Sequence, residues 1–206
     1  MIKLEKTAVM NIDNAIRGAR NPLNSWAKSD SYFDDEGNYI VGEADLGLGL
    51  RLATAGNDHR KYLRMIFVSV DITAPLYWWK EYDTYKVGTV ANSTRTMHKI
   101  HSKEFSRDGF SCDRMSPKAL DCLDQVIATL EETRIAFNET KERAYWDDMI
   151  QLLPSSYNQT RTCTMNYENL INMYYARRNP KLPEWHEFCI LIENLTYAKE
   201  WILIKE

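Results

Sequence analysis

MIFVSVDITAPLYWWKEYDTYKVGTVANSTRTM, residues 65–97, contains the strongest structural signals in the chain. Met65–Ile72 is almost wholly apolar or β-branched, which predicts a buried strand. Ala74-Pro75 then interrupts the extended run. Proline fits the first turn of a helix, because the N–H that it lacks would have no partner there. The pattern therefore predicts a strand followed by a helix over Leu76–Lys86, which Gly88 ends.

The predicted helix is rich in aromatic residues, and a polar segment follows it at Thr89–Arg95. One interpretation is that the helix packs on the strand and the segment is a surface loop. The other is a site that stacks a planar ring on aromatic side chains and binds an anion. The candidate ring-stacking residues are Trp79, Tyr82 and Tyr85, and the candidate anion-binding residues are Lys86, Ser93, Thr94 and Arg95.

This stretch resembles the flavin-dependent thymidylate synthases. That family has a strand, Ala-Pro, an aromatic helix and then the motif Arg-His-Arg-x-x-Ser-x-Asn-Glu-x-Ser-x-Arg-Tyr. Ala74-Pro75 and Trp79 coincide with the pattern, and Arg95 lies one residue from the closing arginine of the motif. Thr84-Tyr85-Lys86 occupies the place of Arg-His-Arg. The order of elements is kept, but most of the flavin signature is lost.

A second match to the same family lies in LLPSSYNQTRTCTMNYENLINMYYARR, residues 152–178. Leu153-Pro154 and Thr164-Met165-Asn166 fall in the family's register without gaps. Asn166 is expected to cap a helix over Tyr167–Arg178, since its side chain can accept from the first N–H groups. Arg177 matches the family's helix-end arginine, which contacts the pyrimidine nucleotide. The resemblance thus implies that Asn166, Arg177 and the adjacent Arg178 lie at a nucleotide site.

Two departures from the family weaken the case for flavin. Glu168 replaces the family's arginine after the asparagine, and Ile150 replaces a second phosphate-binding arginine. Glu184-Trp185 still matches the family's Gln-Trp after a one-residue insertion. A flavin dinucleotide carries a pyrophosphate, which needs converging cations or N–H groups. The losses therefore argue against FAD more strongly than against a nucleotide.

The N-terminal part of the chain offers further candidates. Pro22 and two asparagines predict an irregular turn at Arg20–Trp26, where Asn24 and Ser25 either form a surface turn or bind the polar edge of a ligand. In the resembling family an Ala-Arg-x-Ser segment lies near the nucleotide pocket, and Ala19-Arg20 matches its first half. His59 matches the first histidine of a family motif, or it is an ordinary structural residue. Arg20, Asn24, Ser25 and His59 are accordingly candidate nucleotide-binding residues.

The remaining patterns complete an α/β subunit of the α+β type, with a small mixed sheet and packed helices in one domain of residues 1–206. The resemblance implies the fold of the flavin-dependent thymidylate synthases. The other predicted elements are a strand at Ile2–Met10, helices at Asn11–Arg20, Glu43–Ala55, Pro117–Asn138, Lys141–Leu153 and Pro183–Ile204, and loops at Lys28–Asn38 and Ser106–Ser116.

Composition excludes several classes of function. A net charge of −3 does not favour nucleic-acid binding through a basic surface. No run of 18 apolar residues predicts a membrane span, and the start of the chain lacks a signal-peptide pattern, so a cytoplasmic protein is expected. The four cysteines show no metal-binding spacing. His98, His101 and Glu104 have helical spacing, but no further ligand supports a metal site.

Three hypotheses of function remain open. The first is a diverged flavin-dependent thymidylate synthase, which would methylate deoxyuridine monophosphate with a folate donor and FAD. The second is a non-catalytic protein on the same fold that binds or sequesters a nucleotide or a nucleotide signal. The third is a structural oligomer without a ligand. The resemblance implies a homotetramer, and the apolar helix Leu76–Lys86 also predicts burial against a partner. No catalytic residue is assigned.

Overall fold

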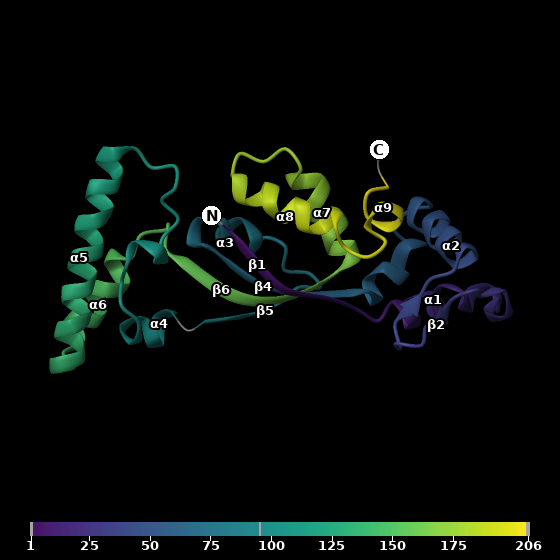
Figure 1. Cartoon of the computed structure of the whole chain (residues 1–206), viewed down its shortest axis with the longest axis horizontal. Coiled ribbons are helices and arrows are strands. Elements are labelled where there is room, and N and C mark those ends of the chain that lie inside the picture. Colours follow the sequence, from purple (N-terminus) through teal and green to yellow (C-terminus); the bar gives the residue numbers. More distant parts are fainter. Residues whose placement is uncertain (1, 95, 205–206) are drawn as a thin grey trace. The chain divides into compact units, whose positions relative to one another are not determined.

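The computed structural model describes residues 2–94 and 96–204. Its main sheet has the strand order β1-β4-β6-β5, and a two-stranded sheet pairs β2 with β3 (Figure 1). The strands are β1 (Lys3–Met10), β2 (Tyr32–Phe33), β3 (Tyr39–Ile40), β4 (Phe67–Pro75), β5 (Val90–Ser93) and β6 (Asn158–Asn166). Helices pack on this small sheet, which confirms the predicted α+β class.

The chain divides into two compact units. The first, which we call unit 1, comprises Met1–Lys3, Ile72–Thr84 and Asn92–Arg161. The second, unit 2, comprises Leu4–Asp71, Tyr85–Ala91 and Thr162–Glu206. The candidate site residues are distributed over both units, so each unit is described by itself.

Strand β6 pairs with β4, and it was not predicted from the sequence. Side-chain hydrogen bonds fix the register at Thr73–Thr160 (2.7 Å), Asp71–Thr162 (2.6 Å) and Ser69–Thr164 (3.3 Å). Numbers rise on one strand as they fall on the other, so the pair is antiparallel. Alternating threonines are typical of a half-buried strand. That signal was masked by the many polar residues of Asn158–Asn166.

Strand β4 begins later and helix α3 ends earlier than the sequence predicts. A 3₁₀ helix occupies Arg60–Met65, β4 continues to Pro75, and α3 spans Leu76–Tyr82 rather than Leu76–Lys86. The first N–H groups of α3 are satisfied outside the helix, since Leu76 N donates to Tyr157 O and Tyr77 N donates to Ser155 O. Strand and helix therefore follow each other without a loop.

The aromatic face of α3 is buried within unit 1. Trp78, Trp79 and Tyr82 are exposed by 0%, 1% and 2%, and their ring centroids lie 4.9–5.3 Å apart. These contacts are those of a packed aromatic cluster. The prediction that this helix needs a partner subunit to cover it was wrong, because the chain's own residues cover it.

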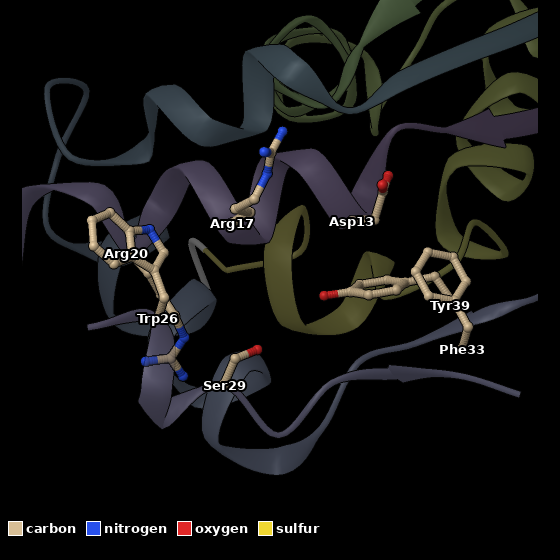
Figure 2. A pocket seen from close by; sticks show the side chains of 7 residues that line it. All are labelled: Asp13, Arg17, Arg20, Trp26, Ser29, Phe33 and Tyr39. Atoms are coloured by element: carbon tan, nitrogen blue, oxygen red, sulfur yellow. The ribbon is translucent and has the colours of Figure 1, made fainter. Parts of the chain in front are cut away.

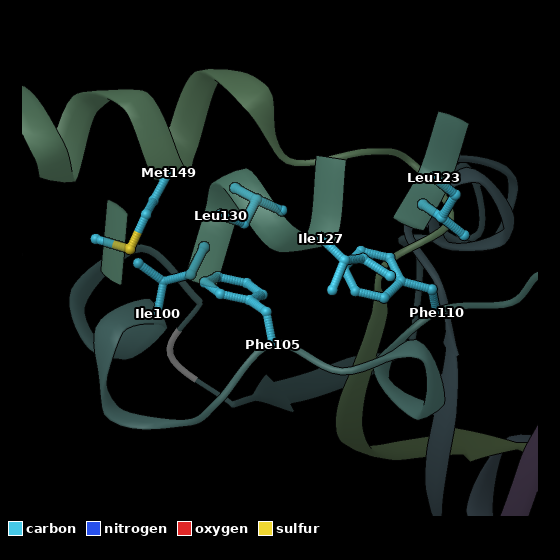
Figure 3. Close-up of a cluster of buried hydrophobic side chains, with 7 residues drawn as sticks. All are labelled: Ile100, Phe105, Phe110, Leu123, Ile127, Leu130 and Met149. Carbon is cyan, nitrogen blue, oxygen red and sulfur yellow. The ribbon is translucent and has the colours of Figure 1, made fainter. Parts of the chain in front are cut away.

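Two long helices form the other part of unit 1. These are α5 (Pro117–Thr140) and α6 (Arg143–Leu152), which pack against each other, and a short helix α4 (Thr96–Lys99) precedes them. Ser116 caps α5 by accepting from Ala119 N, as predicted. One face of α5 joins a buried cluster of Ile100, Phe105, Phe110, Leu123, Ile127, Leu130 and Met149 (Figure 3). The α5 members recur at helical spacing.

Unit 2 contains the remaining helices: α1 (Ile12–Ala19), α2 (Glu43–Thr54), α7 (Tyr167–Arg177), α8 (Pro183–Glu193) and α9 (Ala198–Trp201). Two predictions here were wrong. The loop predicted at Lys28–Asn38 contains β2, and the helix predicted at Pro183–Ile204 is interrupted after Glu193. Asn194 is the C-cap of α8, and Tyr197, in a left-handed conformation with φ 56°, is the N-cap of α9.

The polar segment predicted as a surface loop or a site after Gly88 contains β5, whose residues are all exposed. None of the helices within residues 2–94 and 96–204 is both long and apolar enough to cross a membrane.

Replacing Leu130 by alanine should lower the free energy of unfolding by about 2–5 kcal/mol, because a fully buried side chain leaves a cavity. Ile135→Ala is the matched control on the same helix, since Ile135 is 45% exposed and should matter by about 0.5 kcal/mol or less. Urea unfolding followed by circular dichroism measures both. Equal effects of the two substitutions would contradict the burial of this face of α5.

Candidate functional site

Arg177, at the last turn of α7, lies against two aromatic rings. Its Nε donates to Tyr85 Oη at 2.9 Å, and its guanidinium carbon lies 4.9 Å from the ring centroid of Trp185. Trp185 belongs to α8 and is fully buried, and its ring meets Tyr85 edge to face at 6.0 Å. Cation–π contacts of this kind fix the plane of a guanidinium. Two sequence-predicted residues, Arg177 and Tyr85, are thus brought together.

The N-terminal end of α7 contacts the segment Tyr85–Gly88, which also contains the Tyr85 that Arg177 contacts. Asn166 and Asn169 form a capping box, in which each side chain accepts from the other residue's backbone N–H. Asn169 Nδ2 also donates to Val87 O at 2.6 Å. Gly88 has φ +77°, and a Cβ there would lie 3.0 Å from the Asn166 amide. Asn166 is therefore a buried cap, as its local sequence predicts, and its side chain is engaged within the chain.

The segment Tyr85–Gly88 consequently runs along α7, tied to it at both ends. The hydrogen bonds to Val87 and Tyr85 lie near the N-terminal and C-terminal ends of this 11-residue helix, which is about 16 Å long. Lys86 lies in this segment and is exposed. Lys86, in this segment, and Arg177 and Arg178, at the end of α7, are predicted nucleotide-binding cations of unit 2.

Glu168, in the first turn of α7, forms an ion pair with Arg60. The distance between Arg60 Nη2 and Glu168 Oε1 is 2.8 Å, and the side chains are only 8% and 13% exposed. A carboxylate suits the positive end of a helix dipole. Its negative charge stands where the resembling family has an arginine. His59 precedes Arg60, starts the 3₁₀ helix and is exposed.

Arg20 is part of a second buried ion pair. Its Nε donates to Asp45 Oδ1 at 2.5 Å, and its Nη1 donates to Ser25 O at 3.2 Å. The side chains of Arg20 and Asp45 are 6% and 0% exposed. Asn24 is exposed in a left-handed conformation with φ 48°. The charge of Arg20, a predicted nucleotide-binding residue, is thus paired with Asp45 within the chain.

Hydrogen bonding determines the acidity of Asp45. Burial opposes ionisation, but hydrogen bonds from Ser29, Ser31 and Arg20 outweigh it and hold the pKa below the ordinary value. Ser29 and Ser31 donate from 2.5 Å and 2.6 Å. The carboxylate therefore carries its charge at neutral pH and ties the turn after α1 to α2.

Several other candidates do not join the Arg177 cluster. Trp79 and Tyr82, which were predicted to stack on a ligand, are buried against each other in unit 1. Ser93 and Thr94 are exposed and belong to unit 1, where Thr94 N donates to Thr160 O. Arg178 is exposed, with its guanidinium 5.3 Å from the Tyr175 ring centroid. Arg95 lies outside the residues that the structure describes.

The sequence did not predict the cation–π contact between Arg161 and Trp79. Arg161, on β6, lies 4.1 Å from the Trp79 ring centroid and donates to Asp83 at 2.7 Å. The missing strand prediction concealed it, because only the antiparallel register brings Arg161 to α3. Among residues 2–94 and 96–204, no group of three or more His, Cys, Asp or Glu is arranged to hold a metal ion.

The fold resembles solved structures that contain dUMP. The flavin dependent thymidylate synthase ThyX from Helicobacter pylori, complexed with FAD and dUMP, matches over 97% of both chains, with a TM-score of 0.68 and 16% identity. A second structure of thymidylate synthase X from Helicobacter pylori with FAD and dUMP matches over 100% of both chains, with a TM-score of 0.70 and 15% identity. The match to the UMP/dUMP methylase PolB from Streptomyces cacaoi, bound with 5-Br dUMP, covers 94% of this chain and 88% of that protein's chain. Its TM-score is 0.59 and the identity is 12%.

The sequence itself matches no protein-family model and no characterised protein. At these identities the structural likeness establishes the fold. It confirms the fold-level relationship to the flavin-dependent thymidylate synthases that the sequence motifs predicted.

Replacing Asp45 by asparagine should lower the free energy of unfolding by about 3–5 kcal/mol at neutral pH, because Arg20 is left buried without its charge partner. The folded pKa of Asp45 is below its unfolded value, so the wild type's advantage is complete above the unfolded pKa. The advantage is lost as pH falls through the folded pKa. Urea unfolding of both proteins from pH 7 down to about pH 3 measures this.

Asp35→Asn is the control for the loss of one negative charge, because Asp35 is exposed in the same part of the chain. It should leave stability almost unchanged at every pH. A difference between wild type and Asp45→Asn that stays constant down to acid pH would contradict the role given to the carboxylate.

Proposed function

We propose that this protein binds a pyrimidine nucleoside monophosphate, with Arg177 contacting the phosphate. The observation that carries the proposal is the placement of Arg177. In the sequence, Arg177 aligns with the arginine that contacts the nucleotide in the resembling family. In the structure, its guanidinium lies against Tyr85 and Trp185. Neighbours of the same fold contain dUMP or 5-Br dUMP.

The physical support is preorganisation. A guanidinium has five N–H donors in a fixed plane, and the Nε–H of Arg177 donates to Tyr85 Oη. In the proposal the Nη groups bind phosphate, as a planar fork suited to two of its oxygens. Because the rings already fix that plane, less side-chain entropy is lost on binding. Lys86 adds a mobile positive charge from the segment beside α7.

We further propose that the chain does not retain stoichiometric flavin. The residues at the flavin motif do not fit the group: Thr84 Oγ1 donates to Glu81 O, and Tyr85 accepts from Arg177. Glu168, paired with Arg60, puts a carboxylate where a phosphate-binding arginine is expected. These features favour a protein that binds or sequesters its nucleotide without catalysis.

The second candidate is a diverged thymidylate synthase that methylates its nucleotide. It is supported by the FAD in both Helicobacter pylori structures, which match this chain almost end to end. A homotetramer, which the sequence resemblance implies, and a cytoplasmic location, which the sequence pattern predicts, stay predictions of both candidates.

Arg177→Gln should weaken binding of deoxyuridine monophosphate by about 10- to 150-fold, because a hydrogen bond to a charged partner is worth about 1.5–3 kcal/mol. Tyr85→Phe keeps the ring and removes the hydroxyl that holds Nε, so it should weaken binding by a smaller factor. Calorimetric titration with deoxyuridine monophosphate, uridine monophosphate and other nucleotides measures these affinities.

Lys181→Gln is the matched control, since Lys181 is an exposed cation just beyond α7 and outside the cluster. It should bind like wild type. The proposal fails if no nucleotide binds wild type below millimolar concentration, or if Arg177→Gln binds as tightly as wild type while keeping the same melting temperature.

Purified protein should be colourless, with far less than one flavin per subunit, because Thr84, Tyr85 and Lys86 replace the cationic flavin motif. The visible absorbance spectrum, followed by flavin release on heating, measures this. A yellow preparation with one flavin per subunit would contradict the expectation and favour the enzymatic candidate.

A further inference from the structure

Two hollows in unit 2 share Arg17 and Trp26 in their linings, and neither is lined by a residue of the Arg177 cluster. The first has a volume of about 250 Å³ and is lined by Asp13, Phe33 and Tyr39 among others (Figure 2). The second has about 470 Å³, with Asn14, Asn21 and Met65 in its lining. Both hollows include Arg17 and Trp26. We call the two together the α1 groove, and the larger hollow has the volume of a small-molecule site.

The side chains shared by the two hollows are held in place by neutral amides. Arg17 Nη2 donates to Asn14 Oδ1 at 2.6 Å, and Trp26 Nε1 donates to Asn21 Oδ1 at 2.9 Å. Asn14 in turn donates to Asn11 Oδ1 at 2.8 Å. The cation and the ring are therefore oriented before any ligand arrives, which reduces the entropy lost on binding.

Arg17 is the available positive charge of the α1 groove. Arg20 also lines the first hollow, but Asp45 neutralises it. Within the described part of the chain Arg17 forms no ion pair, although Asp13 lies one turn away on α1 (Figure 2). An exposed guanidinium held only by an amide is well suited to bind an incoming anion. Asp13 offers a carboxylate that can accept from ring N–H or amino groups.

The groove also exposes aromatic rings that most of the chain buries. Trp26 is 50% exposed and Phe33 61%, whereas Trp78, Trp79, Trp185 and Trp201 are at most 1% exposed. A half-exposed indole beside a guanidinium presents one face for stacking and one cation for charge recognition. The turn Asn21–Leu23, with Pro22 at its start, places this indole at the groove.

We propose that the α1 groove binds a planar heteroaromatic molecule with an anionic substituent. The ring stacks on Trp26, its polar edge meets the amides of Asn14 and Asn21 or the carboxylate of Asp13, and its phosphate or carboxylate pairs with Arg17. This site shares no residue with the Arg177 cluster, and the inference does not depend on the function proposed there.

The test is a titration followed by tryptophan fluorescence and by calorimetry. The probes are uridine monophosphate and adenosine monophosphate, the nucleosides uridine and adenosine, nicotinate, and inorganic phosphate alone. Comparing the nucleosides with the nucleotides measures how much the anion contributes to affinity. Comparing inorganic phosphate with the nucleotides measures how much the ring contributes. Nicotinate shows whether the anion bound is a carboxylate or a phosphate. Arg177→Gln serves as the background protein, so that binding at the other proposed site is weakened and contributes less to the signal.

At least one ring-bearing anion should bind saturably and change the Trp26 fluorescence, and the corresponding uncharged ring should bind about 10-fold or more weakly. Arg17→Gln should weaken binding by about 10- to 100-fold. Trp26→Leu should weaken it by about 5- to 100-fold by calorimetry, and Trp26→Phe should retain most of it. Lys28→Gln, an exposed cation of the same segment outside both hollows, should bind like wild type.

Both Arg17 and Trp26 are exposed, so their variants should keep the wild-type melting temperature, and a binding loss then reports the groove itself. The proposal is overturned if no probe binds below millimolar concentration, or if Arg17→Gln binds as tightly as wild type. It is also overturned if Trp26 fluorescence changes with protein concentration and not with the probes, because a second copy of the chain then covers the groove.

Discussion

The antiparallel register of β4 and β6 is the constraint on which the rest of the structure depends. Alternate residues of the two strands bond through hydroxyl and carboxylate groups, from Thr73–Thr160 to Asp71–Thr162. The same register continues into the helices that follow. In unit 1 Leu76 N donates to Tyr157 O where α3 begins, and in unit 2 Tyr167 N donates to Ile66 O where α7 begins. Slipping by one residue would exchange buried for exposed faces along both strands and misplace both helix starts.

How much could be read from the sequence depended on whether a signal was local. The starts of α5 and α7 were predicted correctly, because a capping side chain and the backbone N–H that donates to it lie within three residues. Strand β6 was missed, and the break between α8 and α9 was missed, because both depend on partners far along the chain. Apolar residues continue past Glu193, but α8 ends there with Asn194 as its C-cap, and the left-handed Tyr197 precedes α9.

The residues of the candidate site likewise fall into those that sequence motifs could identify and those whose position depends on tertiary packing. The pairing of Arg177 with Tyr85 follows from motifs that keep their order in the sequence, and the structure brings them together. Trp79 and Tyr82 share the composition of a stacking site, but whether a ring faces solvent or the core is decided by tertiary packing. Residue type alone gives no information on that choice. The same holds for charge: Glu168 and Arg60 read as two surface residues until the fold buries them against each other.

Arg17 and Arg20 show what separates a structural arginine from one suited to a ligand. They lie one turn apart at the end of the same short helix, and both border the first hollow. Arg20 is buried against Asp45, so withdrawing its charge for a ligand would leave that carboxylate unpaired in the interior. Arg17 is exposed and held by an amide, so an anion can bind to it without breaking a charge pair. The cost of binding an anion therefore differs between the two by the energy of a buried ion pair. That difference, rather than sequence position, identifies Arg17 as the residue of the α1 groove that can bind an anion.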